Sequence, residues 1–184
     1  MNLNVGTMVV GTSNQTNNSV IEKYCYNDDP NICVTDGGLY QWDEMMQYST
    51  TGGVQGICPA GWHLPTDTEW VTLEETLGMC SGTTTGSGCS DAAGWRGMDQ
   101  GDQLKTAADC FGGVNCGTSG FQALLAGYRN TNISFSNRGT HAHFWSTTES
   151  GSLVWVRDLL SGEARISRSI GSKANGFSVR CVKD

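Results

Sequence analysis

The sequence predicts an α+β fold in a single domain, and three observations support that prediction. Two helix patterns lie in the N-terminal half, and runs of apolar residues typical of strands follow from residue 121. A chain of 184 residues is within single-domain range, and its 38% of hydrophobic residues can supply a core. The 25 glycines and eight cysteines indicate a loop-rich fold held by disulfides.

Residues 1–36 are expected to form a short N-terminal strand and a hairpin between Cys25 and Cys33. The turn of that hairpin is the polar segment 27–30, which contains Asn, Asp and Pro. A first helix is expected after it, because Leu39, Trp42 and Met45 recur at helical spacing. Residues 37–78 would then hold both helices.

Thr66 and Glu69 predict the start of the second helix. They form a capping box, in which the Thr hydroxyl accepts from one helix N–H and the Glu carboxylate accepts from another. Trp70 begins the apolar stripe of this helix, and Gly78 can adopt the left-handed conformation that ends one. We therefore expect a helix over residues 67–77.

The remainder divides into a loop-rich insertion and a sheet. Residues 79–120 are rich in Gly, Ser and Thr, with a weak helical pattern over 102–108. Residues 121–184 are expected to form a small antiparallel sheet. Its strands are predicted at 121–125, 141–146, 153–159, 164–168 and 177–182.

Charge and hydropathy argue against two classes of partner. A net charge of −7 repels nucleic acid, and the basic residues Arg157, Arg165, Arg168 and Lys173 alternate with acidic ones, as solvated strand charges do. The longest apolar runs are a few residues, so we expect no membrane insertion. Oligomeric state is left open.

The cysteines favour disulfides in an oxidising compartment, since the sequence has no Cys-x-x-Cys pair and no finger-type Cys/His spacing. Three close couples suggest themselves, and Cys58 and Cys181 remain after them. The couples are Cys25 with Cys33, Cys80 with Cys89, and Cys110 with Cys116.

Five blocks of sequence resemble a known family. They are 37–46, 58–70, 126–129, 144–149 and 176–182, and they span most of the chain. In this order they are similar to the Fibrobacter succinogenes major paralogous domain family, a bacterial branch of the C-type lectin-like fold. The Gly/Ser/Thr-rich insertion after the second helix departs from the family pattern.

The resemblance implies a fold, a bridge and a binding region. It implies a C-type lectin-like fold outside the cell, with a Cys58–Cys181 disulfide that ties the helix region to the last strand. It also implies structural roles for Trp155 and Arg157. Lectin-like domains bind through the loops and strands before the last strand, and some relatives, variable proteins of diversity-generating retroelements, diversify residues there.

Alternation along the segment 153–159 predicts which side chains face a ligand. Leu153, Trp155, Arg157 and Leu159 share one face, which leaves the next residues on the other, more exposed face. Burial of the two valines under a neighbouring loop is the alternative. The candidate ligand-binding residues are Asn130, Asn132, His141, His143, Val154, Val156, Asp158, Arg165, Ser167 and Ser169.

We expect no cofactor. His141 and His143 can approach a common ion on a strand, but the local sequence has no third ligand, so an exposed or hydrogen-bonded pair is favoured. The calcium motifs of sugar-binding lectins are missing from the sequence. The segment 27–31 offers oxygen ligands that calcium prefers, although a disulfide-bounded turn needs no metal.

These observations predict an extracellular module that binds a protein or carbohydrate through residues 129–173 and is not an enzyme. One alternative is an oxidoreductase like the formylglycine-generating enzymes, which share the lectin-like fold and need a reactive cysteine pair near the end of the domain. Here the late cysteine, Cys181, would be consumed by its bridge. The other alternative is a purely structural surface module.

Overall fold

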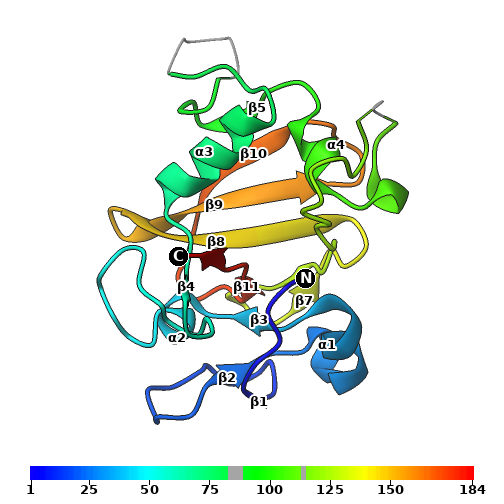
Figure 1. Ribbon diagram of the computed structural model, residues 1–184. Helices are drawn as coiled ribbons and strands as arrows, with labels where there is room; N and C mark the ends of the chain where they lie inside the picture. The colour runs from blue at the N-terminus through cyan, green and yellow to red at the C-terminus, as the bar shows by residue number, and fades with distance from the viewer. Residues whose placement is uncertain (83–88, 113–114) are drawn as a thin grey trace.

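A six-stranded mixed sheet forms the centre of the computed structural model, which describes residues 1–82, 89–112 and 115–184 (Figure 1). Neighbouring strands are antiparallel except β11 and β8, which are parallel. The strand order is β3 (Leu39–Tyr40), β11 (Phe177–Ser178), β8 (His141–Ser150), β9 (Leu153–Leu160), β10 (Ile166–Gly171) and β5 (Gly94–Arg96).

Three two-stranded ladders surround this sheet in the described part of the chain. One joins β12 to β4 and so brings the C-terminal segment beside the turn before the second predicted helix. The pairs are β1 (Thr7–Met8) with β2 (Glu22–Lys23), β4 (Trp62–His63) with β12 (Val182–Lys183), and β6 (Tyr128–Arg129) with β7 (Phe135–Ser136).

The second predicted helix is confirmed as α3 (Asp67–Thr76). Thr66 and Glu69 form the capping box, and Gly78 follows the helix with a φ of 92°. The first predicted helix is shorter than expected: α2 (Trp42–Met45) is one turn, because Leu39 and Tyr40 pair as β3 with β11. The weak helical pattern corresponds to α4 (Gln100–Leu104) and a 3-10 turn over Ala107–Asp109.

The expected hairpin between Cys25 and Cys33 is wrong. A 3-10 turn (Tyr26–Asp28) and α1 (Pro30–Asp36) occupy this segment. Asp29 caps α1 by accepting from the Asn31 N–H, and Pro30 stands at the first helical position, where its missing N–H costs nothing. The Asp-Pro pair is therefore a helix start and not a turn.

The predicted strands hold at the centre and fail at the edges. β8 and β9 contain the expected segments and β10 overlaps the expected one at 166–168, but 121–125 contributes only an isolated bridge at Ala123. The insertion supplies β5, which the sequence did not predict, on the outer edge of β10. The parts of the insertion at 83–88 and 113–114 lie outside the described residues.

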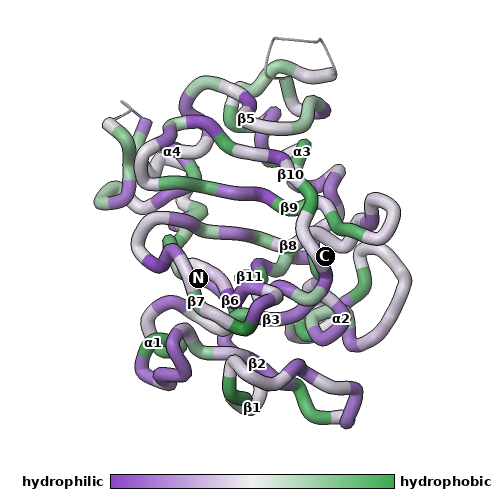
Figure 2. The backbone as a smooth tube through the Cα atoms, turned by 180° about the vertical axis from the view of Figure 1, so that it is seen from behind, coloured by the Kyte–Doolittle hydropathy of each residue, from purple (hydrophilic) through white to green (hydrophobic). Residues whose placement is uncertain are grey.

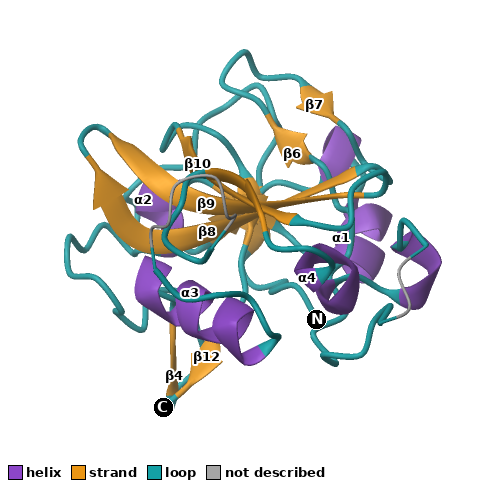
Figure 3. Ribbon diagram, turned by 90° about the horizontal axis from the view of Figure 1, so that it is seen from above, coloured by secondary structure: helices purple, strands orange, loops and turns teal. Residues whose placement is uncertain are grey.

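The two faces of the sheet carry different layers (Figure 3). α3 covers one face, the helix face, where Phe144, Leu159 and Ile166 pack with Trp70. The β6–β7 hairpin lies on the opposite side, the open face. Seen from that side, β8 and β9 cross the view with no helix in front of them (Figure 2).

Val154 and Val156 are buried in a hydrophobic core on the open face, whereas the sequence predicted that they are exposed. They are 0% and 2% exposed and pack with Trp145 and Phe177 on the open face. Gly171 makes room for this packing, since a Cβ there would lie 2.9 Å from the Phe177 ring. Alternation predicted the correct face for the two valines. Phe177, which is distant from them in the sequence, covers this part of the face.

A buried ion-pair network joins α3 to the helix face. Arg157, fully buried, donates to Asp67 Oδ1 over 2.7 Å and to Glu74. Arg96 also pairs with Glu74, and Arg168 pairs with Asp67. The expectation that Arg157 and Arg168 are solvated charges is therefore wrong, because acidic residues of a distant helix face them.

All eight cysteines form disulfides: Cys25–Cys33, Cys58–Cys181, Cys80–Cys89 and Cys110–Cys116. These are the expected pairs. The helices and sheets described above confirm the predicted α+β class. No helix in the described ranges has the length and apolar character needed to cross a bilayer.

Candidate ligand-binding site

Four of the predicted site residues meet on the open face of the sheet. His143 of β8 lies opposite Asp158 of β9, which lies opposite Ser167 of β10. Asp158 accepts from His143 Nδ1 over 2.7 Å, from Ser167 Oγ over 3.1 Å and from Ser169 Oγ over 2.6 Å. One carboxylate thus ties three neighbouring strands together, and we call these four residues the open-face cluster.

Aromatic rings enclose the His143 imidazole. Phe177 stacks on it at a centroid distance of 4.9 Å, and Tyr128 of β6 meets it edge-on at 4.9 Å. His141 stacks at 5.9 Å on the same strand. The cluster is therefore a polar centre with an aromatic wall, half-buried, with side chains 16% and 13% exposed at His143 and Asp158.

The hydrogen bonds keep Asp158 ionised. Burial would raise the pKa of this carboxyl, but the bonds from His143, Ser169 and Ser167 outweigh it and lower the pKa below the usual value. Burial and the neighbouring His143 lower the pKa of His141, so its imidazole stays neutral to a lower pH than usual. Asp158 therefore carries its negative charge at neutral pH.

His143 Nε2 is buried and has no hydrogen-bond partner. In the neutral imidazole, the carboxylate at Nδ1 favours the tautomer with the proton on Nδ1 and the lone pair on Nε2. A serine nucleophile would have to donate to that lone pair, as in a serine hydrolase. Ser167 and Ser169 both donate to Asp158 instead, so the cluster contains an Asp–His pair without the nucleophile contact.

The other predicted residues lie apart from the cluster. Asn130 and Asn132 belong to the β6–β7 loop, where Asn132 Oδ1 accepts from the Ser134 backbone and hydroxyl. Arg165, 44% exposed, pairs with Glu163 at the β9–β10 turn. With the buried Val154 and Val156, these residues show that the predicted surface is smaller and more polar than expected.

Tyr128 and Phe177 were missed as site residues. Both belong to blocks that carry the family resemblance, but no periodicity in their own segments points to His143. Tyr128 reaches it through the β6–β7 hairpin, and Phe177 through the parallel pairing of β11 with β8. Only these long-range pairings reveal the contact.

Side chains considered for metals have other partners. Asp28 Oδ1 accepts from the Gly11 N–H over 2.7 Å, and Asp29 caps α1. In the described ranges, Asp102, Cys110 and Cys116 lie close enough together to hold an ion, but the two sulfurs form a disulfide, which is a poor ligand.

The chain is a disulfide-bonded α+β domain with a polar cluster on one sheet face. The family model of the Fibrobacter succinogenes major domain matches residues 1–183, so the chain belongs to that family. No curated protein and no solved structure matches the chain.

Proposed function

We propose that this domain is an extracellular ligand-binding module on a C-type lectin-like scaffold. Its ligand, a protein or a glycan, contacts the open face around His141, His143, Asp158 and Ser169. The observation that carries the proposal is the convergence of polar side chains from three strands beside the aromatic rings of Tyr128 and Phe177. Carbohydrates and protein loops both bind such mixtures of polar and aromatic groups.

Two further observations support the proposal. The four disulfides suit a protein that works outside the cell. They also leave no cysteine free for the chemistry of the oxidoreductase alternative, since Cys181 is bonded to Cys58.

Glycan and protein arrays test the proposal with three forms of the domain. Ser169→Arg puts a long charged side chain on the open face. Ile170→Arg is the matched control, because Ile170 is the next residue on β10, faces the other way and is 48% exposed. We expect array hits of the wild type to persist with I170R and to disappear with S169R.

Two results would contradict the proposal. Hits that survive S169R but vanish with I170R would put the site on the wrong face. No hit in repeated screens would favour a purely structural module. Thermal unfolding of each variant establishes that both are folded before the arrays are compared.

A further inference from the structure

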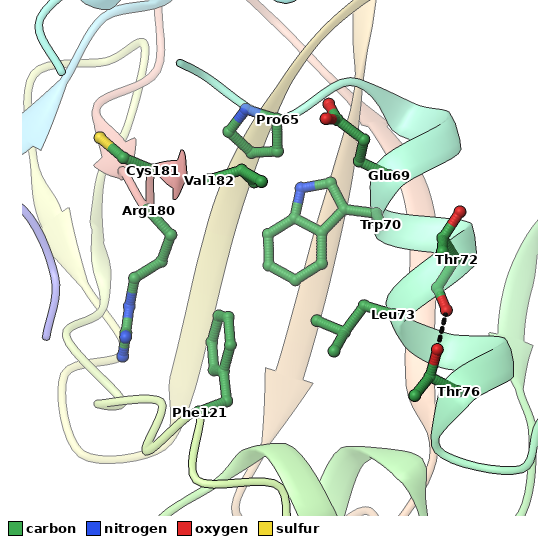
Figure 4. Close-up of a pocket in the computed structure, with 10 residues that line it drawn as sticks. All are labelled: Pro65, Glu69, Trp70, Thr72, Leu73, Thr76, Phe121, Arg180, Cys181 and Val182. Carbon is green, nitrogen blue, oxygen red and sulfur yellow. Dashed lines mark hydrogen bonds between the residues drawn. The ribbon is translucent and has the colours of Figure 1, made fainter. Parts of the chain in front are cut away.

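An apolar groove lies on the helix side of the sheet, away from the open-face cluster (Figure 4). Trp70 and Leu73 of α3 form one wall, and Phe121 and Val182 face them. The groove has a volume of about 430 Å³, within the usual range of small-molecule sites. Nothing in the open-face site uses these residues.

Arg180 brings a positive charge to this groove. Its Nε donates to Asn2 Oδ1 and its Nη2 to the Gln122 carbonyl, each over 2.8 Å, and its guanidinium lies 4.3 Å from the centroid of the Phe121 ring. Both acceptors are neutral, and Arg180 makes no ion pair within the described ranges. Burial alone lowers the pKa of Arg180 to about 10. The cation is partly desolvated and lacks a counter-charge from the described chain.

The acidic residue of the groove is already engaged. Glu69 accepts from the Thr66 backbone and hydroxyl, each over 2.8 Å, and from His63 over 2.6 Å. Arg180 therefore has no neutralising partner there, and the groove is positive at the Arg180 side and negative at the Glu69 side. An anionic group entering it would be drawn to Arg180.

We infer that this groove binds a small organic carboxylate with an apolar body, whose carboxylate pairs with Arg180. A guanidinium matches a carboxylate with two parallel N–H bonds, and the apolar body would lie against Trp70 and Leu73. A small molecule fits better than a peptide, because Thr72 and Thr76 donate their hydroxyls to carbonyls of their own helix. They leave no free hydroxyl donor for a peptide backbone.

The first test compares 3-phenylpropionate with 3-phenylpropanamide, which has the same apolar body without the charge. Each is titrated into the full chain, and affinity is followed by amide chemical shifts. We expect the acid to bind at least about tenfold more tightly, as a hydrogen bond to a charged partner implies. The shifts should map to α3, Phe121 and the segment 180–182.

Matched variants assign that preference to Arg180. Arg180→Gln should abolish the preference for the acid. Val182→Glu, two residues along the chain and also lining the groove, should also abolish it by neutralising Arg180, whereas Val182→Gln should keep it. The Glu and Gln variants have nearly the same shape, so their difference isolates the charge even if both weaken packing.

The inference is overturned if the acid and the amide bind equally, if neither binds, or if V182E retains the preference. Each result leaves the open-face proposal intact, because that proposal concerns other residues and other ligands.

Discussion

Asp158 is the residue on which the open-face cluster depends. Its carboxylate accepts three side-chain hydrogen bonds from two neighbouring strands while remaining 13% exposed. This carboxylate stays ionised only because it accepts these hydrogen bonds, since burial by itself disfavours the ionised form. The same bonds that fix the site therefore contribute to folding.

Asp158→Asn should destabilise the domain by about 1–3 kcal/mol at pH 7, the cost of leaving buried donors without their acceptor. The folded-state pKa of Asp158 is lowered, so its contribution is present above the unfolded value of about 3.9 and is lost as pH falls through the folded value. Urea unfolding from pH 7 to pH 3 should show the gap to wild type narrowing with acid.

Asp43→Asn is the control for that series, since Asp43 is exposed on α2 and should change stability by less than about 0.5 kcal/mol. A gap for D158N that stays constant across the pH range would mean that the Asp158 charge does not contribute.

Burial also separates two arginines that look alike in the sequence. Arg157 is fully buried against Glu74 and Asp67, whereas Arg165 is 44% exposed against Glu163. Arg157→Met should cost about 3–5 kcal/mol, because it removes a fully buried cation that pairs with both Glu74 and Asp67 and leaves each acid with a single arginine. Arg165→Met should cost less than about 1 kcal/mol. Similar midpoints in chemical denaturation would contradict the buried network.

At the scale of elements, α3 is the part of the fold that local chemistry defines best. The capping box fixes its start, and Gly78 follows its end. Trp70, which belongs to its apolar stripe, packs against Phe144. The side chain of Glu74 then ties the helix to Arg157 and Arg96. A short helix is held on the sheet by its cap, its apolar stripe and its buried charge.

Thr66→Ala should destabilise the domain by about 1 kcal/mol, the usual cost of a lost N-cap. Thr68→Ala is the matched control: it is the same exchange two residues later, where the side chain is exposed, and it should stay within about 0.5 kcal/mol. Equal effects in thermal unfolding would show that the capping box is not a stabilising contact.

The elements that sequence could predict are those with local signals. The capping box predicted α3, and alternation predicted β8, β9, β10 and their faces. β5 gave no such signal, because it has three residues and is a strand only through its neighbours. β11 was predicted only as part of a longer strand over 177–182, of which it forms the first two residues. For the same reason the sequence predicted the cluster only in part. Alternation grouped the four residues His143, Asp158, Ser167 and Ser169. It could not show that Phe177, from a segment distant in the sequence, covers Val154 and Val156.

At the scale of the whole molecule, the Cys58–Cys181 disulfide joins the segment before α3 to the last strand pair. Its cysteines are 123 residues apart, whereas Cys25 and Cys33 are 8 apart. Chain entropy then predicts a cost of about 5 kcal/mol for the double replacement Cys58→Ala with Cys181→Ala, and about 3 kcal/mol for Cys25→Ala with Cys33→Ala. Denaturant unfolding of both variants measures which replacement costs more stability. A larger loss for the Cys25–Cys33 variant would contradict this account.

The central claim is that the open face binds the ligand, and the three histidines test it most directly. His141 and His143 belong to the open face, while His63 lies beside α3, bonded to Glu69 and Asp184. Imidazole nitrogen NMR spectra would be recorded as an array-selected ligand is added. The account predicts that the His141 and His143 signals shift while His63 stays unchanged. A shift confined to His63, or no shift at saturation, would contradict it.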